Sequence, residues 1–571
     1  MKVGFLRRFF IRLLPLSGLL LIPLLTLIWG WQLIFYDRLW LSHDLFVHYQ
    51  WANQFSLALS EGVLQPKWAA LSHYGAGDPT FLYYQPGLYY VVAVLNQLGL
   101  NIWEAIKFSL LLANLMLGLM VWLILRRHAN EYLALFGAGF SQLQPLYFFL
   151  VYLGNAYPWA FAMPFAALVV WRSSFSTKAS IDPWLSMALM LLVLSHILTA
   201  FMCLLVLGLE RFFRSIAQRD PRALIYWSLS VILGLGMAAF YFFPAFLARD
   251  WVSPEGWFQM DFLNWRNSFA FPILSAWSWG THWMSVQWIH PSVLVLIGLA
   301  SIVVYRYRQD QQTTIQPVLF NLFIAAMVAI ILASEWSFPV WHLSETLRIV
   351  QWPYRFTVVL MLSVIWIVPL ALALGLPRHR YLCGTIIIIF LTPFLLFCAL
   401  QVQIAINGQS PQPRLEQAMQ GDFGQPEYFP AGTRELFWKD YFTQGGFEQE
   451  CIDRDWSCEE QIWQTHYRRW RLEGTASTAI RLPVFDFPTW QVRQNGTVLA
   501  HSTDPNTGLI LVSLPAGQHD IELVWVPTPI EWIGRVVSIV SLLVFFGVLL
   551  VKLIKNAALQ KTRYSDSNQT P

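Results

Sequence analysis

Charged residues are scarce in this chain. Asp, Glu, Lys and Arg make up 12% of its 571 residues, whereas soluble domains average about 25%. Hydrophobic residues fill the deficit and account for 56% of the sequence. This balance excludes an ordinary water-soluble protein and predicts a chain that crosses a membrane many times.

The sequence also lacks the motifs of nucleotide-driven proteins. It has no Walker loop, no GxGxxG fingerprint and no nucleophile elbow, which argues against an ATP-driven transporter. The net charge is only +4, and Lys and Arg cluster beside apolar segments, as topology signals do. We therefore expect no nucleic-acid partner.

Cysteines are few, and they divide into two groups. Cys203, Cys383 and Cys398 lie in apolar runs, where cysteine usually packs as an inert small residue. Cys451 and Cys458 lie in the polar segment CIDRDWSC, which lacks the CxxC spacing of zinc or redox sites. If that segment is extracytoplasmic, the pair is predicted to form a disulfide.

Long apolar runs are abundant. Their number predicts a polytopic α-helical membrane protein with about twelve transmembrane helices, and basic residues beside the runs place both termini in the cytoplasm. Runs of spanning length occur at 13–36, 105–125, 133–151, 157–171, 184–212, 225–247, 291–305, 317–334, 354–375, 381–401 and 530–551.

Two further segments are ambiguous. Residues 82–99 either cross the membrane or lie along its outer interface. A continuous helix over 184–212 would be about 43 Å long, too long for one hydrocarbon core of about 30 Å and too short for two. We favour a tight hairpin bent near His196 together with an interfacial 82–99, because this combination keeps the basic residues RRH (126–128), Arg172 and Lys178 on the cytoplasmic side.

Composition divides the chain into three parts. Residues 1–401 form the transmembrane domain, residues 402–528 an extracytoplasmic domain rich in Gly, Pro and charge, and residues 529–571 the final transmembrane helix and a cytoplasmic tail. The outer loops of the first part are predicted at 37–81, 248–290 and 336–353. Loop 248–290 is rich in tryptophan, as an interfacial belt or a cavity wall would be.

The second half of 402–528 reads as β-strands. The alternating segments STAIRLPVF, TWQVRQNGTVLA, LILVSLP and HDIELVWV predict a small antiparallel sandwich. Its Asn-Gly pair accepts the positive φ angles of a type I′ hairpin turn. Residues 402–470 carry no pattern that assigns a structure.

Residues that can carry chemistry gather after the first apolar run, in the segment WLSHDLFVHYQWANQF. Asp44 can act as a general base or as the N-cap of an amphipathic helix over 45–60. His43, His48 and Asp78 are conceivable zinc ligands, but no tight spacing such as HExxH is present. We expect no cofactor, with a divalent metal as the alternative.

Cations predicted outside the membrane are candidate phosphate holders. Arg355, in QWPYRF at the outer end of a helix, fits best because arginine binds a phosphodiester in a bidentate manner. Arg348 and Lys67 follow. Arg355 can equally be an interfacial residue that snorkels. His196, a polar group inside an apolar run, is either functional or hydrogen bonded to a neighbouring helix.

This order of features resembles the GT-C superfamily of membrane glycosyltransferases, which take sugars from polyprenyl-phosphate carriers. The family pattern is a helix, an external acidic residue, an amphipathic helix ending in SG, a Trp/Pro stretch and a Pro-Leu-Tyr-Tyr motif. Asp44, SEG (60–62), QPKW (65–68) and QPGLYY (85–90) match it. The resemblance implies that Asp44 is the catalytic base or a metal-linked carboxylate.

The chain departs from that pattern at two places. The family's Pro-Pro pair is replaced by Gln85-Pro86-Gly87, and its second acidic motif should fall near VYLGNAYPW (151–159), where only Asn155 is available. PYRF (353–356) and the strand region are similar to YfhO-like bacterial membrane proteins. The early region with SHILTA (195–200) is similar to 6-pyruvoyl-tetrahydropterin synthase-related membrane proteins.

These features predict an inverting GT-C-type glycosyltransferase at the outer face of the plasma (inner) membrane. Its partners would be membrane lipid, a polyprenyl-phosphate-linked sugar, and a glycan or protein acceptor in the cell envelope. The alternatives are a lipid-linked glycan transporter or flippase, for which no repeat is detected and mid-span charges are few, and a non-catalytic scaffold. Asp44 is the predicted base, and the predicted substrate-binding residues are Arg355, Arg348, Lys67, Gln85, Asn155, His196, His43 and His48.

Overall fold

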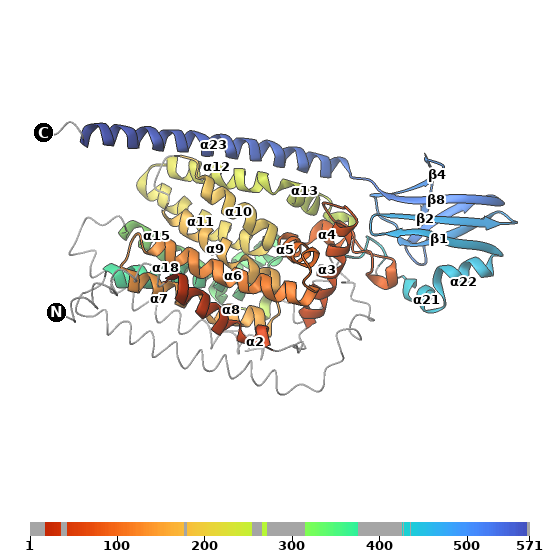
Figure 1. The fold of residues 1–571 in the computed structure, drawn as a ribbon, viewed down its shortest axis with the longest axis horizontal. Helices are drawn as coiled ribbons and strands as arrows, with labels where there is room; N and C mark the ends of the chain where they lie inside the picture. Colours follow the sequence, from red (N-terminus) through yellow and green to blue (C-terminus); the bar gives the residue numbers. More distant parts are fainter. Residues whose placement is uncertain are drawn as a thin grey trace.

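Helices form most of the protein, and a β domain lies beyond one end of them, next to α3 and α4 (Figure 1). The computed structural model describes residues 18–35, 43–175, 180–253, 265–270, 315–374, 425, 428–433 and 436–567. A first helix covers Gly18–Trp29. The other helices of the described region are α2 (Trp31–Phe35), α3 (His43–Ser60), α4 (Thr80–Tyr83), α5 (Gly87–Gln97), α6 (Ile102–Leu125), α7 (Glu131–Gln142), α8 (Pro145–Phe148), α9 (Tyr157–Phe175), α10 (Pro183–Ser195), α11 (Ile197–Gln218), α12 (Arg222–Met237), α13 (Ala239–Leu247), α15 (Gln316–Ala333), α16 (Phe338–Leu343), α17 (Glu345–Arg348), α18 (Thr357–Leu374), α21 (Trp438–Thr443), α22 (Gly446–Asp453) and α23 (Pro529–Ser567).

The prediction of about twelve membrane spans is wrong for the structure as described. Among the described residues, five helices are long and apolar enough to cross a membrane, or six if the bent pair α12 and α13 counts as one span. The predicted runs 291–305 and 381–401 lie outside the described residues, as does most of loop 248–290. The five helices are Ile102–Leu125, Glu131–Tyr152, Gln316–Ala333, Pro353–Ala373 and Pro529–Lys555.

More spans were predicted than the described structure contains, partly because several apolar runs of spanning length are interrupted. The run 225–247 bends by 84° between α12 and α13, and the run 184–212 breaks at His196, whose φ of −159° and ψ of 95° are extended rather than helical. The expected break at His196 is thus present, whereas the tight hairpin stays a prediction. Residues 82–99 are also interrupted, because α5 has 11 residues and is about 17 Å long, shorter than a bilayer core.

Buried polar side chains hold the first helix against α6 and α7. Gln142 donates from Nε2 to the Thr26 hydroxyl (2.7 Å) and to Asn114 Oδ1 (3.1 Å), and Asn114 Nδ2 donates to the Gln142 carbonyl (3.1 Å). Gly118 makes room for this contact, since a Cβ there would lie 2.5 Å from the Gln142 side chain. Small and amide residues of this kind join helices where there is little water.

The β domain consists of two antiparallel sheets that share one apolar core, as predicted for the strand region. The Asn495-Gly496 turn between β4 and β5 has φ angles of 49° and 77°, the positive values that a type I′ turn requires. Five strands form one sheet in the order β1 (Trp456–Gln464), β2 (Tyr467–Gly474), β8 (Gly517–Trp525), β4 (Trp490–Gln494) and β5 (Thr497–Val498), and three form the other in the order β3 (Thr478–Phe485), β7 (Leu509–Leu514) and β6 (Ser502–Thr503).

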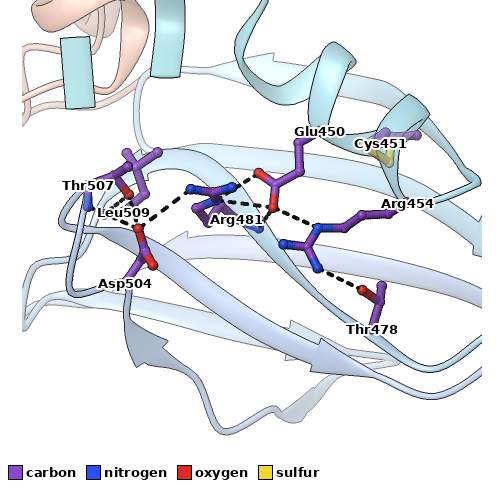
Figure 2. A network of polar contacts seen from close by, with 9 residues as sticks. Glu450, Cys451, Arg454, Thr478, Arg481, Asp504, Thr507 and Leu509 are labelled. Atoms are coloured by element: carbon purple, nitrogen blue, oxygen red, sulfur yellow. Dashed lines mark hydrogen bonds and ion pairs between the residues drawn. A yellow bond between two sulfur atoms is a disulfide. The ribbon is translucent and has the colours of Figure 1, made fainter. Parts of the chain in front are cut away.

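The predicted disulfide between Cys451 and Cys458 is present and joins α22 to β1. Beside it, Glu450 is buried between two arginines (Figure 2): its carboxylate lies 3.0 Å from Arg481 Nε and 3.2 Å from Arg454 Nε. Pairing on both sides compensates for the desolvation of the Glu450 charge. The network therefore fixes α22 on the edge of β3.

The loop before α4 is packed into the β domain. Trp68, Ala70 and Ala76 belong to the apolar core of the two sheets, and Trp68 is fully buried against the rings of the domain. Arg468 of β2 donates from Nη2 to the carbonyls of Ala70 (3.3 Å) and Gly75 (3.0 Å). The sheets and the loop before α4 therefore form one packed body.

Candidate functional site

Asp44 is the second residue of α3 and has an exposed side chain. A carboxylate in the first turn of a helix is favoured by the helix dipole. Its charge lies within electrostatic range of Arg355 and of the phenol groups of Tyr89, Tyr157 and Tyr354. The structure thus brings together the predicted base and the predicted phosphate-binding residue, which are far apart in sequence.

Arg355 lies in a short 3₁₀ turn, Pro353–Phe356, that leads into α18. Nη1 donates to the Val350 carbonyl (2.9 Å) and to Gln351 Oε1 (3.1 Å), and the guanidinium lies over the Trp352 ring at 4.1 Å. Among the described residues, Nε is buried and has no hydrogen-bond partner. The guanidinium is therefore oriented by its own loop and retains one unused donor.

Arg355 also faces His196 through an indole ring. The guanidinium carbon is 5.9 Å from the Trp159 ring centroid, and Trp159 stacks on His196 with ring centroids 5.2 Å apart and an interplanar angle of 6°. His196 Nδ1 caps α11 by accepting from the Thr199 N–H at 3.2 Å. His196 therefore caps the helix that follows it, and a functional role for its ring beside Trp159 stays a prediction.

His48 forms the wall of the site on α3. Its Nδ1 is hydrogen bonded to the Tyr89 hydroxyl at 2.8 Å, and its ring lies 5.8 Å from that of Tyr157 and 5.9 Å from that of Trp51. Burial lowers the pKa of His48 to about 3, so the imidazole is neutral near pH 7. His48 can therefore accept or donate one hydrogen bond but brings no charge.

Asn155 lies at the base of the aromatic cluster. It follows a π-helical turn, Phe149–Leu153, and has a φ of 47°, a left-handed conformation that asparagine tolerates better than most residues. Oδ1 accepts from the Tyr157 hydroxyl at 3.3 Å, while Nδ2 is buried without a partner among the described residues. π-Helical turns and unsatisfied buried amides are both enriched at functional sites.

The Gln85-Pro86-Gly87 departure from the family pattern has a local reason. Gly87 begins α5 and touches the end of α10, because a Cβ at this position would lie 2.7 Å from the Leu194 carbonyl oxygen. This contact lies two residues before the His196 break. Gln85 is buried next to it.

The remaining predicted residues lie elsewhere. Arg348 binds the carbonyls of Trp341 (3.3 Å) and His342 at the end of α16, and Lys67 lines a separate cavity under the β domain. His43 begins α3, but its side chain is outside the described part of the protein.

The histidines and acids of the described region do not assemble a metal centre. Asp78 pairs with His73, whose Nε2 is 3.2 Å from Asp78 Oδ2, rather than with His48. Within the described ranges, no group of three His, Cys, Asp or Glu side chains is placed to hold a metal ion. The second acid of the proposed family is Asn155 here, which removes one carboxylate ligand from the site.

Sequence reasoning missed most of the aromatic residues in this cluster. Tyr84 precedes the QPGLYY motif and Tyr89 lies within it, so both could have been proposed from it. Tyr428, which precedes the β domain, contacts Trp51 and Tyr83, and no local signal marks it.

Comparisons with known proteins add no relative: no protein-family model matches the chain, and no curated protein matches it. The resemblance to GT-C and YfhO-like proteins thus stays a prediction from the short motifs quoted above.

Proposed function

We propose that this protein is an integral-membrane glycosyltransferase that moves a sugar from a polyprenyl-phosphate carrier to a glycan or protein acceptor of the cell envelope. The observation that supports the proposal is that the charges of Asp44 and Arg355 lie within electrostatic range of each other, beside a cluster of tyrosines, tryptophans and neutral histidine. Transfer from a glycosyl phosphate needs a carboxylate on the side of the attacking acceptor and a cation at the departing phosphate, so the two charges must lie on either side of one sugar.

Each group has a task in such a transfer. Asp44, exposed at the start of α3, would take the proton of the acceptor hydroxyl as its oxygen attacks the anomeric carbon. Arg355 would hold the departing phosphate, on which negative charge develops. The rings of Trp51, Trp159 and Tyr84 would stack on the sugar.

The membrane part of the proposal is supported by α23. In an apolar 18-residue window of Pro529–Lys555, only 11% of the residues are buried inside the protein, and exposed apolar area on this scale is unfavourable in water. A hydrocarbon environment removes that cost, because it surrounds the apolar side chains with apolar lipid. A helix is compatible with this environment because its backbone groups are hydrogen bonded internally.

The orientation of the protein follows from the same proposal. The plasma (inner) membrane would hold the chain with both termini in the cytoplasm, and the β domain would bind the acceptor outside. The Cys451–Cys458 disulfide supports an external β domain, because disulfides persist in oxidising compartments.

Asp44→Asn tests the proposal. In a host that lacks the gene, this variant should abolish the surface glycan that the wild-type protein restores, and transfer from a polyprenyl-phosphate sugar should fall by about 10²–10⁴-fold. Asp220→Asn, in the exposed turn between α11 and α12, is the matched control and should behave as wild type. If Asp44→Asn is expressed normally and leaves the surface glycan unchanged, the proposal of an enzyme is wrong and a non-catalytic scaffold is the better proposal.

A further inference from the structure

A cavity lies where the β domain, the loop after α3 and the first turns of α23 meet. Its volume is about 390 Å³, within the range of small-ligand sites. The lining side chains used below are Gln65, Lys67, His466, Trp525, Glu531 and Arg535. None of them belongs to the Asp44–Arg355 cluster.

Two buried charges face this cavity without an ion-pair partner. Lys67 is 4% exposed and Glu531 is 2% exposed. Glu531 uses Oε1 in the capping box of α23, accepting from the Thr528 N–H at 3.2 Å, while Oε2 is buried with no partner among the described residues. The Lys67 ammonium has no hydrogen bond or ion pair within the same part of the chain. Buried charges are costly unless they are paired.

Arg535 adds a second cation one helical turn after Glu531. Its Nε donates to Gln65 Oε1 at 3.0 Å, and its guanidinium carbon lies 4.9 Å from the Trp532 ring. These contacts hold the guanidinium at the cavity while leaving its other nitrogens for a ligand. The cavity thus has two cationic groups and one carboxylate.

His466 closes the cavity on the side of the β domain and contributes no charge. Its Nε2 accepts from the Lys67 backbone N–H at 3.0 Å, which places the ring proton on Nδ1, next to the Thr465 hydroxyl. Burial, and then the Lys67 charge, lower the pKa of His466 to about 3. The charges of the cavity are therefore those of Lys67, Arg535 and Glu531.

The rim of the cavity is apolar. Leu64, which lines the cavity, is 77% exposed, and Trp532 and Ile533, which follow the lining residue Glu531 in sequence, are exposed where the long apolar stretch of α23 begins. A soluble ligand needs no such rim, whereas the acyl chains of a lipid would cover it.

We propose that this cavity binds the head group of a zwitterionic phospholipid of the phosphoethanolamine class. The phosphodiester would lie between Lys67 and Arg535, and the ammonium would donate to Glu531 Oε2. The proposal rests on the membrane placement given under Proposed function, but not on the glycosyl-transfer activity.

The test uses the purified full-length chain, delipidated in detergent, with lipid binding measured by native mass spectrometry. Phosphatidylethanolamine should bind wild type at least about tenfold more tightly than Lys67→Ala, the change that a single charge-assisted contact produces. Lys67→Arg, which keeps the cation, should retain binding. Glu531→Gln should lower the preference for phosphatidylethanolamine over phosphatidylglycerol, because the amide carries no charge for the ammonium.

Three results would overturn the proposal: equal binding of phosphatidylethanolamine by wild type and Lys67→Ala, equal binding of the two lipids by wild type, or equally tight binding of soluble phosphoethanolamine. The last result would make the ligand a free metabolite rather than a lipid. Asp44→Asn is run in parallel and should keep full lipid binding, so failure of the transferase proposal and failure of the lipid site are separate outcomes.

Discussion

The disulfide of the β domain gives a prediction whose size follows from the chain. Replacing both Cys451 and Cys458 by alanine frees a loop with a sequence separation of 7. Closing such a loop removes about 8 cal/mol/K of entropy from the unfolded state, which corresponds to about 2.4 kcal/mol at 25 °C. The double variant should therefore unfold its β domain about 10 °C below wild type, given the entropy of unfolding of about 100 residues.

Differential scanning fluorimetry of the full-length chain, with and without dithiothreitol, measures this shift. The reductant should lower the melting temperature of wild type by a similar amount and leave the double variant unchanged. Loss of stability in the double variant without any effect of the reductant on wild type would contradict the entropic reasoning, since it would assign the effect to packing of the buried Cys451 side chain.

The same cysteines report on topology. Cys451→Ala leaves the Cys458 thiol unpaired in β1, where it is partly exposed. In intact cells, a membrane-impermeant maleimide should label this variant and should not label wild type, in which the buried Cys203 is the free cysteine of the described residues. If Cys451→Ala is labelled only after the cells are lysed, the β domain lies in the cytoplasm. This result would contradict the proposal of a transferase at the outer face of the membrane.

Two further predictions concern Lys67 and Gly87. Burial lowers the pKa of Lys67 to about 8, while the charge of Glu531 opposes this shift and that of Arg535 adds to it. Binding of phosphatidylethanolamine should therefore weaken as the pH rises through 8, whereas Lys67→Arg should still bind at about pH 9 because arginine stays charged. A flat wild-type profile in a titration by native mass spectrometry would exclude Lys67 as the phosphate ligand. Gly87→Ala should cost about 1–3 kcal/mol, because its Cβ meets a carbonyl rather than a flexible side chain. Gly547→Ala in α23, where nothing lies within 4 Å, is the control in the same thermal melt and should be stabilising by up to about 1 kcal/mol.

Features that depend on residues close together in the sequence were predictable. The strands β3, β4, β5, β7 and β8 fall in the segments predicted from their alternation, and the Asn495-Gly496 turn needs only two residues to set its φ angles. The break at His196 was marked by a polar residue inside an overlong apolar run. The strand β2 was missed because Arg468 points inward with Trp470 and Leu472 and so breaks the alternation.

Features that depend on packing were not predictable. The hydropathy of 225–247 predicts one span, because Ala238, where the chain bends, is an apolar residue within an apolar run. Asp44 and Arg355 were chosen by residue type and by position at helix ends, and the structure brings them within electrostatic range of each other. Tyr428 joins their cluster from the other side of a long segment, a contact that only the folded chain reveals.

The burial of Trp68 within the sheets has a consequence for how the molecule can be divided. A fragment that starts at residue 402 would carry an apolar hole where this indole belongs, and should aggregate unless residues before α4 are supplied with it. Held in this way, the sheets cannot separate from the loop before α4 without exposing this indole and the rings packed against it.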